Sequence, residues 1–321
     1  MVATIIYSRT VRYIVAICAF MSLSCKQDMA NIEIASSGAA KQQLVNGNQT
    51  MSAQAAVADS SLKILSYNIY EGFRGDEALK NSFTQWIDSL KPDVMAFQEL
   101  NGFTGETFRQ YFKDRGYPYT VMLRKSAFPM GLASKYPITN IKKVVDGMRH
   151  GCLYGKILGH HFYVTHLEPN DYNNRRLEIE IIKNEIGQIP STEKILLMGD
   201  LNNMSPQDSL AYQNEEKMRL VRVTEANNPA VHILNNGKID YYVLQAMFDI
   251  NFQDTWKLFH TGYEKSAPTK VKNHNNYTRI DYILVNQTLS PDCLDAYIIK
   301  DGVTDYLSDH YPMFLKLKRS L

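Results

Sequence analysis

The sequence predicts an α/β protein with mixed β-sheets, and three observations support this fold class. Segments with strand-like and helix-like patterns alternate from Leu62 to the end of the chain. Two strand-like runs, 153–158 and 161–167, are separated by the short turn Gly159-His160, which indicates a β-hairpin. No linker-like stretch interrupts residues 62–321, so we expect one large domain there.

Strands are predicted where branched and aromatic residues gather between turn signals. The run 62–70 (LKILSYNIY) has this composition and is followed by Gly72. The run 194–201 (KILLMGDL) is mostly apolar, as in a strand that is buried on both faces. The other predicted strands are 94–100, 119–124, 131–136, 153–158, 161–167, 279–285 and 311–318.

Helices are predicted where apolar residues recur every three to four positions. Leu79, Phe83 and Ile87 give this spacing within 78–90. The other predicted helices are 103–116, 174–189 and 239–248.

Residues 1–24 resemble an export signal. Arg9 and Arg12 precede an apolar stretch, 13–23 (YIVAICAFMSL), which is as long as a signal-peptide core and too short to span a bilayer. A small residue and then Cys25 follow at once, which resembles a bacterial lipoprotein signal. We therefore expect an exported lipoprotein, lipidated at Cys25 and anchored to a membrane in the periplasm or at the cell surface. The alternatives are an ordinary cleaved signal, which gives a secreted protein, and a buried helix.

Residues 25–61 are predicted to be a flexible tether between the anchor and the folded domain 62–321. They are rich in Ala, Ser, Gln and Asn, contain few aromatic residues and show no apolar period. Such a segment cannot bury enough surface to offset its ordering entropy. The membrane would then be contacted through the lipid anchor only, and we expect the protein to be a monomer.

The composition excludes several classes of protein. Apolar residues make up 45% and charged residues 21% of the chain, as in a globular domain. No apolar run reaches about 18 residues, which excludes a multi-pass membrane protein. The formal charge is only +2, and removing the predicted signal would remove Arg9 and Arg12 but no acid. Net charge therefore gives no support for a nucleic-acid substrate.

The four cysteines include no closely spaced pair of the kind that holds structural zinc. After export, Cys152 and Cys293 would be the thiols of the folded part. They could form one disulfide in an oxidising compartment, and the sequence equally allows two free buried cysteines.

Polar residues stand at the ends of several predicted strands, where an apolar core would not place them. In α/β sheets such residues line the functional crevice. Each alone could be a cap, a turn or a surface charge, but together they predict a site. They are Asn68, Gln98-Glu99, Thr165-His166, Gly199-Asp200-Leu201-Asn202, Arg279-Ile280-Asp281 and Ser308-Asp309-His310.

The side chains of this set suit metal-assisted hydrolysis of a phosphoester. Their carboxylates and amides form an oxygen-rich group, which suits Mg²⁺, Mn²⁺ or Ca²⁺. His166 and His310 can exchange protons or stabilise a developing anion. A divalent ion and a cationic histidine would offset charge on the phosphoryl oxygens while a carboxylate orients or activates water.

Taken in order, these motifs resemble those of the endonuclease/exonuclease/phosphatase superfamily, and the segment 133–138 (ASKYPI) resembles another of its motifs. The resemblance covers about residues 62–319. It implies a deoxyribonuclease-like, four-layer α/β/β/α sandwich with two mixed β-sheets packed face to face, and a metal-dependent phosphoric ester hydrolase. Residues 208–238 match no segment of the family.

The resemblance also implies a metal site and a phosphate contact. Glu99 looks like the principal metal ligand, with Asn68 and Asp309 near the same ion, and Mg²⁺ is the expected ion with Mn²⁺ or Ca²⁺ as alternatives. Arg175 stands where many members carry an arginine that contacts the substrate phosphate.

The implied catalytic residues come from four of the motifs. Asp200 and Asn202 resemble the pair that orients the attacking water and the phosphate. His310 resembles the histidine that contacts the scissile phosphate, and Asp281 resembles its orienting partner. His166 resembles a second histidine of the deoxyribonuclease, sphingomyelinase and phosphoinositide-phosphatase branches.

The reaction is better determined than the substrate, because the superfamily cleaves DNA, RNA, sphingomyelin and inositol phosphates. We expect a phosphodiesterase, of which an endonuclease is one form. A sphingomyelinase-like enzyme or an inositol-phosphate phosphatase is the alternative, and a non-catalytic binding protein on the same scaffold is a remote one.

Two local basic groups bear on the substrate. Basic and tyrosine residues interleave in 109–125, which suits phosphates and bases or, alternatively, a solvated helix face followed by core tyrosines. Lys270 and Lys272, before His274, form the second group.

Overall fold

The computed structural model describes residues 61–272 and 274–319. The predicted signal 1–24, the lipidation site Cys25 and the predicted tether lie outside these residues, apart from Ser61, which opens the first strand. Among the described residues, no helix is both long and apolar enough to cross a bilayer.

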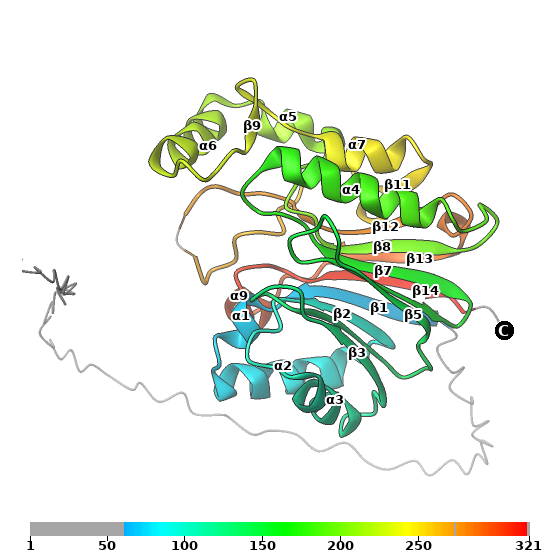
Figure 1. The fold of residues 1–321 in the computed structure, drawn as a ribbon. Helices are drawn as coiled ribbons and strands as arrows, with labels where there is room; N and C mark the ends of the chain where they lie inside the picture. The colour runs from blue at the N-terminus through cyan, green and yellow to red at the C-terminus, as the bar shows by residue number, and fades with distance from the viewer. Residues whose placement is uncertain (1–60, 273, 320–321) are drawn as a thin grey trace, which may run out of the picture. The chain divides into compact units, whose positions relative to one another are not determined.

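Two six-stranded mixed sheets form the centre of the fold (Figure 1). Within the first sheet β1 and β2 are parallel, and within the second β7 and β8 are parallel; the other neighbours are antiparallel. The first sheet has the order β13 (Cys293–Ile298), β14 (Met313–Lys318), β1 (Ser61–Asn68), β2 (Val94–Gln98), β4 (Met130–Ser134) and β3 (Tyr119–Leu123). The second has the order β11 (Phe252–Asp254), β12 (Asp281–Asn286), β8 (Ile195–Asp200), β7 (His160–His166), β6 (Cys152–Ile157) and β5 (Thr139–Val144).

The two sheets pack face to face through an apolar core. Alternate residues of a strand point to opposite faces, so Ile64 of β1 faces the second sheet while Leu65 faces the helices outside. Val164 of β7 and Met198 of β8 contribute to the same inter-sheet core. Each of these four side chains is fully buried, and burial of such a side chain stabilises the fold by roughly 1.5–3 kcal/mol.

Helices cover the outer face of each sheet, which confirms the predicted α/β sandwich (Figure 1). Helices α2 (Glu77–Leu90) and α3 (Gly105–Lys113) pack on the first sheet, and α4 (Tyr172–Ile186) and α7 (Tyr242–Phe248) pack on the second. Side chains of Asp76, Thr104 and Asp171 cap the free backbone N–H groups at the starts of α2, α3 and α4. The remaining elements are α1 (Tyr70–Phe73), η1 (Pro206–Asp208), α5 (Ser209–Tyr212), α6 (Glu215–Asn227), β9 (Leu234–Asn235), β10 (Lys238–Ile239), α8 (Thr255–Phe259), η2 (Ser290–Asp292) and α9 (Thr304–Leu307).

Several predicted boundaries were wrong. The helix predicted for 239–248 begins only at Tyr242, because Ile239 belongs to β10 and the Asp240 carboxylate accepts the Tyr242 backbone N–H at 3.1 Å. The strand predicted for 62–70 ends at Asn68, and the strand predicted for 279–285 begins at Asp281.

Cys152 and Cys293 do not form a disulfide. Both thiols are free; Cys152 is buried in β6 and Cys293 is half-buried at the start of β13. Burial raises the pKa of both thiols, so neither is a reactive thiolate at neutral pH.

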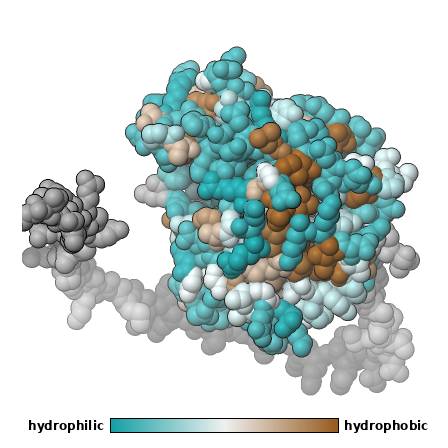
Figure 2. Space-filling view, viewed as in Figure 1, coloured by the Kyte–Doolittle hydropathy of each residue, from teal (hydrophilic) through white to brown (hydrophobic). Residues whose placement is uncertain are grey.

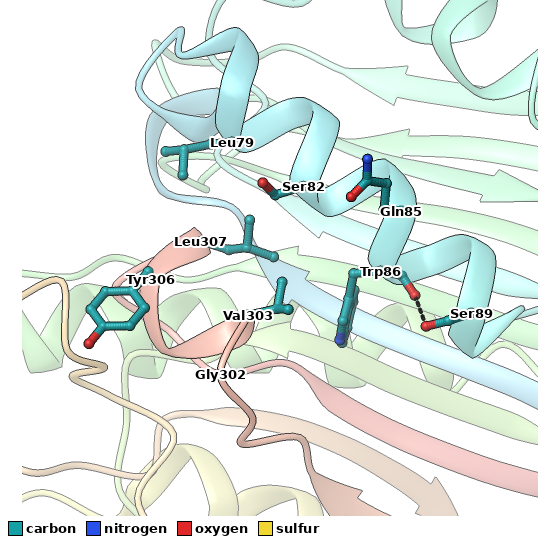
Figure 3. A pocket seen from close by; sticks show the side chains of 9 residues that line it. All are labelled: Leu79, Ser82, Gln85, Trp86, Ser89, Gly302, Val303, Tyr306 and Leu307. Carbon is teal, nitrogen blue, oxygen red and sulfur yellow. Dashed lines mark hydrogen bonds between the residues drawn. The ribbon is translucent and has the colours of Figure 1, made fainter. Parts of the chain in front are cut away.

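The surface carries a groove between α2 and α9 (Figure 3). It has a volume of about 420 Å³ and is lined by the side chains of Leu79, Trp86, Tyr306 and Leu307 among others. None of its lining residues is a carboxylate or a histidine, so it lacks the groups needed for hydrolysis. The face shown in Figure 2 is largely hydrophilic and is crossed by a hydrophobic strip.

Candidate active site

Three predicted site residues lie in one row across the second sheet. His166 of β7 is in register with Asp200 of the parallel strand β8, and Asp200 is in register with Asp281 of the antiparallel strand β12. By alternation, each residue points to the same face as the inter-sheet core residues of its own strand; His166 and Asp200 follow those residues, and Asp281 precedes them. The row therefore lies next to the inter-sheet apolar core, at one edge of the sandwich.

Asn68 joins this row to the first sheet. Its amide Nδ2 donates to Asp200 Oδ2 at 3.1 Å and to Glu99 Oε1 at 3.1 Å. Its Oδ1 accepts the backbone N–H of Tyr70 at 3.1 Å, which fixes the orientation of the amide. In this orientation Asn68 holds two carboxylates from different sheets at a common centre.

Glu99 follows the last residue of β2 and adopts a left-handed backbone conformation, with φ of 60°. Its Oε2 accepts the backbone N–H of Glu71 at 2.9 Å, and its carbonyl accepts the N–H of Gly72 at 2.7 Å. Burial raises the pKa of this carboxyl, against the hydrogen bond from Asn68. A half-buried carboxylate with a raised pKa is stabilised in its charged form by a nearby cation.

Asp200 is the most enclosed carboxylate of the row, with 1% of its surface exposed. Its Oδ1 accepts the backbone N–H of Asn202 at 2.9 Å, and Asn202 Nδ2 donates to the carbonyl of Leu167 at 2.9 Å. These bonds tie the ends of β8 and β7 together. Burial raises the pKa of Asp200, against the positive charge of His310.

His310 is paired with Asp281. The distance from Nδ1 to Asp281 Oδ2 is 2.8 Å, and Nδ1 lies 3.8 Å from Asp200 Oδ2. Burial alone would lower the pKa of His310, but the charges of Asp281 and Asp200 hold it well above the usual value. The ring is therefore an imidazolium at neutral pH, with Nε2–H available as a donor.

His166 is neutral by contrast. Burial and the charge of His310 lower its pKa to about 3. Its ring stacks on His150 with centroids 4.6 Å apart and an interplanar angle of 17°. His166 Nε2 lies 3.6 Å from Asp200 Oδ2, and its buried Nδ1 has no hydrogen-bond partner among the described residues.

The structure places Asp309 beside this group and Arg175 against the loop that follows β7. Asp309 is half-buried, and its charge contributes to the raised pKa of Asp200. Arg175 is 2% exposed, and its Nη1 donates to the carbonyls of Glu168 and Pro169 at 2.9 and 3.1 Å. Through these hydrogen bonds Arg175 holds the loop after β7 in place.

The donor atoms fit a divalent cation around Glu99 better than around His310. Asp200, Asp281 and His310 offer ligand atoms within 4.8 Å of one another. However, His310 Nδ1 and Asp281 Oδ2 are already hydrogen-bonded to each other at 2.8 Å. The half-buried Glu99 and the buried Asp200 instead present carboxylate oxygens on either side of the Asn68 amide, and carboxylate oxygen is the donor type that Mg²⁺ prefers.

Two supporting residues were missed from the sequence. Ser266 Oγ donates to Asp281 Oδ2 at 2.7 Å and accepts the backbone N–H of Ile280 and Asp281. Glu71 supports Glu99 through its backbone alone. A single serine in a loop and a backbone N–H leave no pattern in the sequence, so neither could have been found there.

Comparison with known proteins gives a consistent result. Residues 65–310 match the model of the Endonuclease/Exonuclease/phosphatase family. Among solved structures, an AP endonuclease from Archaeoglobus fulgidus is similar with a TM-score of 0.61 and 17% identity, covering 80% of this chain and 99% of that one. The 3′ phosphatase NExo from Neisseria, bound to a product DNA hairpin, has a TM-score of 0.61 and 14% identity, with coverage of 80% and 99%. A structure of the 3′-5′ exonuclease NExo from Neisseria meningitidis has a TM-score of 0.60 and 14% identity, with coverage of 80% and 100%. A search of curated proteins found no match to this sequence.

Proposed function

The chain belongs to the Endonuclease/Exonuclease/phosphatase family, and from this premise we propose that it is a metal-dependent phosphodiesterase that cleaves by direct attack of water. The row of His166, Asp200 and Asp281, joined to Glu99 through Asn68, carries this proposal. Together with His310, which is paired with Asp281, this cluster combines an acceptor for the proton of water with a cationic donor for the phosphate.

Each side chain has a part in the reaction. Asp200 accepts a hydrogen bond from water, and takes its proton as the new P–O bond forms and the ester P–O bond breaks. The His310 imidazolium donates from Nε2 to a phosphoryl oxygen, where negative charge builds up. Asp281 keeps that ring charged and oriented through Nδ1. The departing alkoxide is protonated by solvent.

Glu99 and Asp309 would hold the cation, with the Asn68 amide beside them, and we propose Mg²⁺, with Mn²⁺ or Ca²⁺ able to replace it. When bound, such an ion supplies positive charge to the phosphoryl oxygens. Asn68 sets the separation of the Glu99 and Asp200 carboxylates. Asn202 fixes Asp200 from the other side.

Nucleic acid is the proposed substrate class. The similar structures are those of an AP endonuclease and of a 3′ phosphatase and exonuclease that was solved with a DNA hairpin. The segment 109–125 does not add to this case, because Tyr117 is buried with its hydroxyl on the Pro92 carbonyl and Tyr111 bonds to Thr84. A sphingomyelinase-like or inositol-phosphate activity is the alternative that a substrate panel tests.

The activity test uses the purified chain, Mg²⁺ or Mn²⁺, and a panel of plasmid DNA, RNA, sphingomyelin and inositol phosphates. Glu99→Ala and His310→Ala should each abolish turnover, as should a chelator, while the exposed carboxylate variant Glu106→Ala should retain it. Turnover that survives chelation and both site variants would refute the proposal. Binding without turnover of any phosphoester would instead favour a non-catalytic binding protein.

We further propose that the protein is exported as a monomer and anchored through a lipid on Cys25. The support is the sequence pattern of an apolar core followed by a small residue and cysteine. Metabolic labelling with a fatty acid should mark the wild-type chain and not Cys25→Ser. An unlabelled wild-type chain that is found in the medium would show plain secretion.

A further inference from the structure

We propose that Tyr70, Arg74 and Lys272 form a subsite next to the active site that binds a second phosphate of the substrate, one that is not hydrolysed. These three residues are called the cationic rim below. The inference rests on the proposed function and deepens it, because it restricts the substrate to phosphoesters that carry at least two phosphate groups. A choline lipid, with one phosphate and a cationic head group, does not fit such a rim.

Two segments that are far apart in the sequence meet at the Tyr70 side chain. Lys272 Nζ donates to Tyr70 Oη at 2.5 Å and lies 4.4 Å from the centroid of its ring. Arg74 Cζ lies 5.4 Å from the same centroid. Tyr70 and Arg74 belong to α1 and its C-terminal cap, whereas Lys272 belongs to the loop between α8 and β12. Two cations therefore flank one aromatic ring.

Both segments are fastened directly to the active site. On one side, the Tyr70 backbone N–H donates to Asn68 Oδ1 at 3.1 Å. On the other, the backbone N–H of Thr269 donates to the Asp309 carbonyl at 3.1 Å. The rim is thus built on the residues that follow Asn68 and on the loop that lies against Asp309.

The cations of the rim have no ion-pair partner among the described carboxylates, although Asp309 and Glu71 lie near enough to Lys272 to interact with its charge. Residues 265–280 contain several basic residues and no acidic one. Lys270 pairs with Asp305 at 2.7 Å, and Arg279 is buried against two aspartates. Within 61–272 and 274–319, neither Lys272 nor Arg74 forms an ion pair with a carboxylate.

An anion with several acceptor oxygens matches these donors. Lysine and arginine offer only donors, and a tyrosine hydroxyl can donate as well. A phosphate oxygen bonded to such cations makes a charge-assisted hydrogen bond of about twice the strength of a neutral one. The scissile phosphate is served by His310, so the rim is placed for a neighbouring phosphate of the same molecule.

Helix α6 holds the rim loop in position. The Lys217 side chain, 6% exposed, donates from Nζ to Asn276 Oδ1 and to the Tyr277 carbonyl, both at 2.6 Å. This gives a role to part of 208–238, the segment that the family resemblance left without one. The loop is therefore anchored at Asp309 and at Lys217.

The test measures kcat and KM of the full chain with Mg²⁺ on three substrates. Bis(4-nitrophenyl) phosphate has one phosphate, while a short oligodeoxynucleotide and an inositol trisphosphate have several. Lys272→Gln should lower kcat/KM by about tenfold on a substrate with several phosphates, mainly through KM, and by less than about twofold on the one-phosphate ester. The slope of log kcat/KM against log salt should fall by about 1 for the same substrate.

Two variants control for changes that are not due to lost charge in the rim. Lys270→Gln alters a lysine of the same loop that is already paired with Asp305, and should change neither substrate preference nor salt slope. Lys272→Arg keeps the charge and should restore most of the activity on the substrate with several phosphates.

The outcomes separate this inference from the proposed function. An effect on the oligodeoxynucleotide alone assigns the rim to a nucleic-acid strand, and an effect on the trisphosphate alone assigns it to an inositol polyphosphate; both support the rim. An equal loss on all three substrates, or no loss, overturns it. A wild-type chain that cleaves only the one-phosphate ester also overturns the rim and leaves the phosphodiesterase intact, whereas a chain that cleaves none of the three refutes the proposed function.

Discussion

His310 Nδ1 lies 2.8 Å from Asp281 Oδ2, and this contact links the loop after α9 to the first residue of β12. The same carboxylate oxygen accepts the Ser266 hydroxyl at 2.7 Å, so Asp281 is held from two sides. Because Asp281 and Asp200 together outweigh the effect of burial on the pKa of His310, the ring stays cationic. The positive charge of His310 is thus maintained by carboxylates on two neighbouring strands of the second sheet, β8 and β12.

Asp281→Asn should therefore weaken catalysis without a large change in shape. The neutral amide still fits between Ser266 and His310 but no longer raises the pKa of the ring, so the imidazolium is lost at lower pH. We expect kcat to fall by about 10²–10³-fold and the alkaline limb of the pH–rate profile to move to lower pH. Asp88→Asn, an exposed aspartate of α2, should leave both unchanged. A profile for Asp281→Asn that is parallel to the wild type would contradict this account of His310.

Gly199→Ala should disturb the site through the backbone. Gly199 has a φ of +139°, and a Cβ atom there would lie 1.9 Å from the carbonyl oxygen of Thr165. Gly159→Ala is the matched control, since φ is +79° and a Cβ would meet no atom within 4 Å. The control carries only the left-handed backbone strain of about 1–2 kcal/mol. In urea unfolding, Gly199→Ala should cost at least about 2 kcal/mol more than Gly159→Ala and should lose activity, because Asp200 is the next residue. Equal costs would show that β7 and β8 separate easily.

The alternation of residues along the strands explains why most of the site could be predicted from the sequence. In β1 the inter-sheet positions read Ile64, Ser66 and Asn68, and in β8 Met198 is followed by Asp200. A polar residue that takes the next alternate position after apolar ones, at the end of a strand, can be recognised from the sequence alone. The row that these residues form across β7, β8 and β12 depends on strand order, which alternation does not encode.

The elements that were missed have few buried residues, so their sequences carry no clear apolar pattern. β5 is an edge strand whose residues Thr139 to Lys143 are all exposed, so no alternation marks it. Helix α6 lies in 208–238, has only Lys217 and Val221 buried, and so lacks a clear apolar stripe. Arg175 is a different case: the family resemblance suggested a phosphate contact for it, while its burial and its hydrogen bond to the Glu168 carbonyl depend on tertiary packing, which the sequence pattern does not encode.

The stacked pair His150 and His166 should make the fold sensitive to acid. Both rings are nearly fully buried, with 2% and 4% exposed, and burial lowers the pKa of each to about 3. Above the ordinary value of about 6.5 neither state binds a proton. As pH falls from there towards 3 the unfolded chain takes up protons that the folded chain excludes, so stability is lost.

His150→Phe should reduce this loss, because phenylalanine can still stack on His166 but does not titrate. The free energy of unfolding of the wild type should fall more steeply between pH 6 and pH 4, by up to about 1.4 kcal/mol per unit of pH, than that of the variant. His232→Phe replaces a histidine whose side chain is 58% exposed and should keep the wild-type slope. Parallel slopes for wild type and His150→Phe would mean that His150 is protonated in the folded protein.

Arg279 should contribute to stability through a fully buried ion-pair network. Its side chain is 0% exposed, and it donates to Asp208 Oδ2 from Nε at 2.7 Å and to Asp254 Oδ2 from Nη1 at 2.5 Å. Lys257 pairs with the other Asp208 oxygen at 2.6 Å. These contacts join η1, the end of β11 and the segment that leads into Asp281.

Arg279→Ala would leave two buried carboxylates short of a partner and should cost about 3–5 kcal/mol of unfolding free energy. Arg279→Lys keeps the charge but loses the planar fork, so its cost should lie between those of alanine and wild type. Arg222→Ala, which removes an exposed pair with Glu215, should cost less than about 1 kcal/mol. Since Arg279 stands two residues before Asp281, the lysine variant should also lower kcat on the one-phosphate ester. A stable Arg279→Ala protein with unchanged turnover would show that the network neither holds the fold together nor positions Asp281.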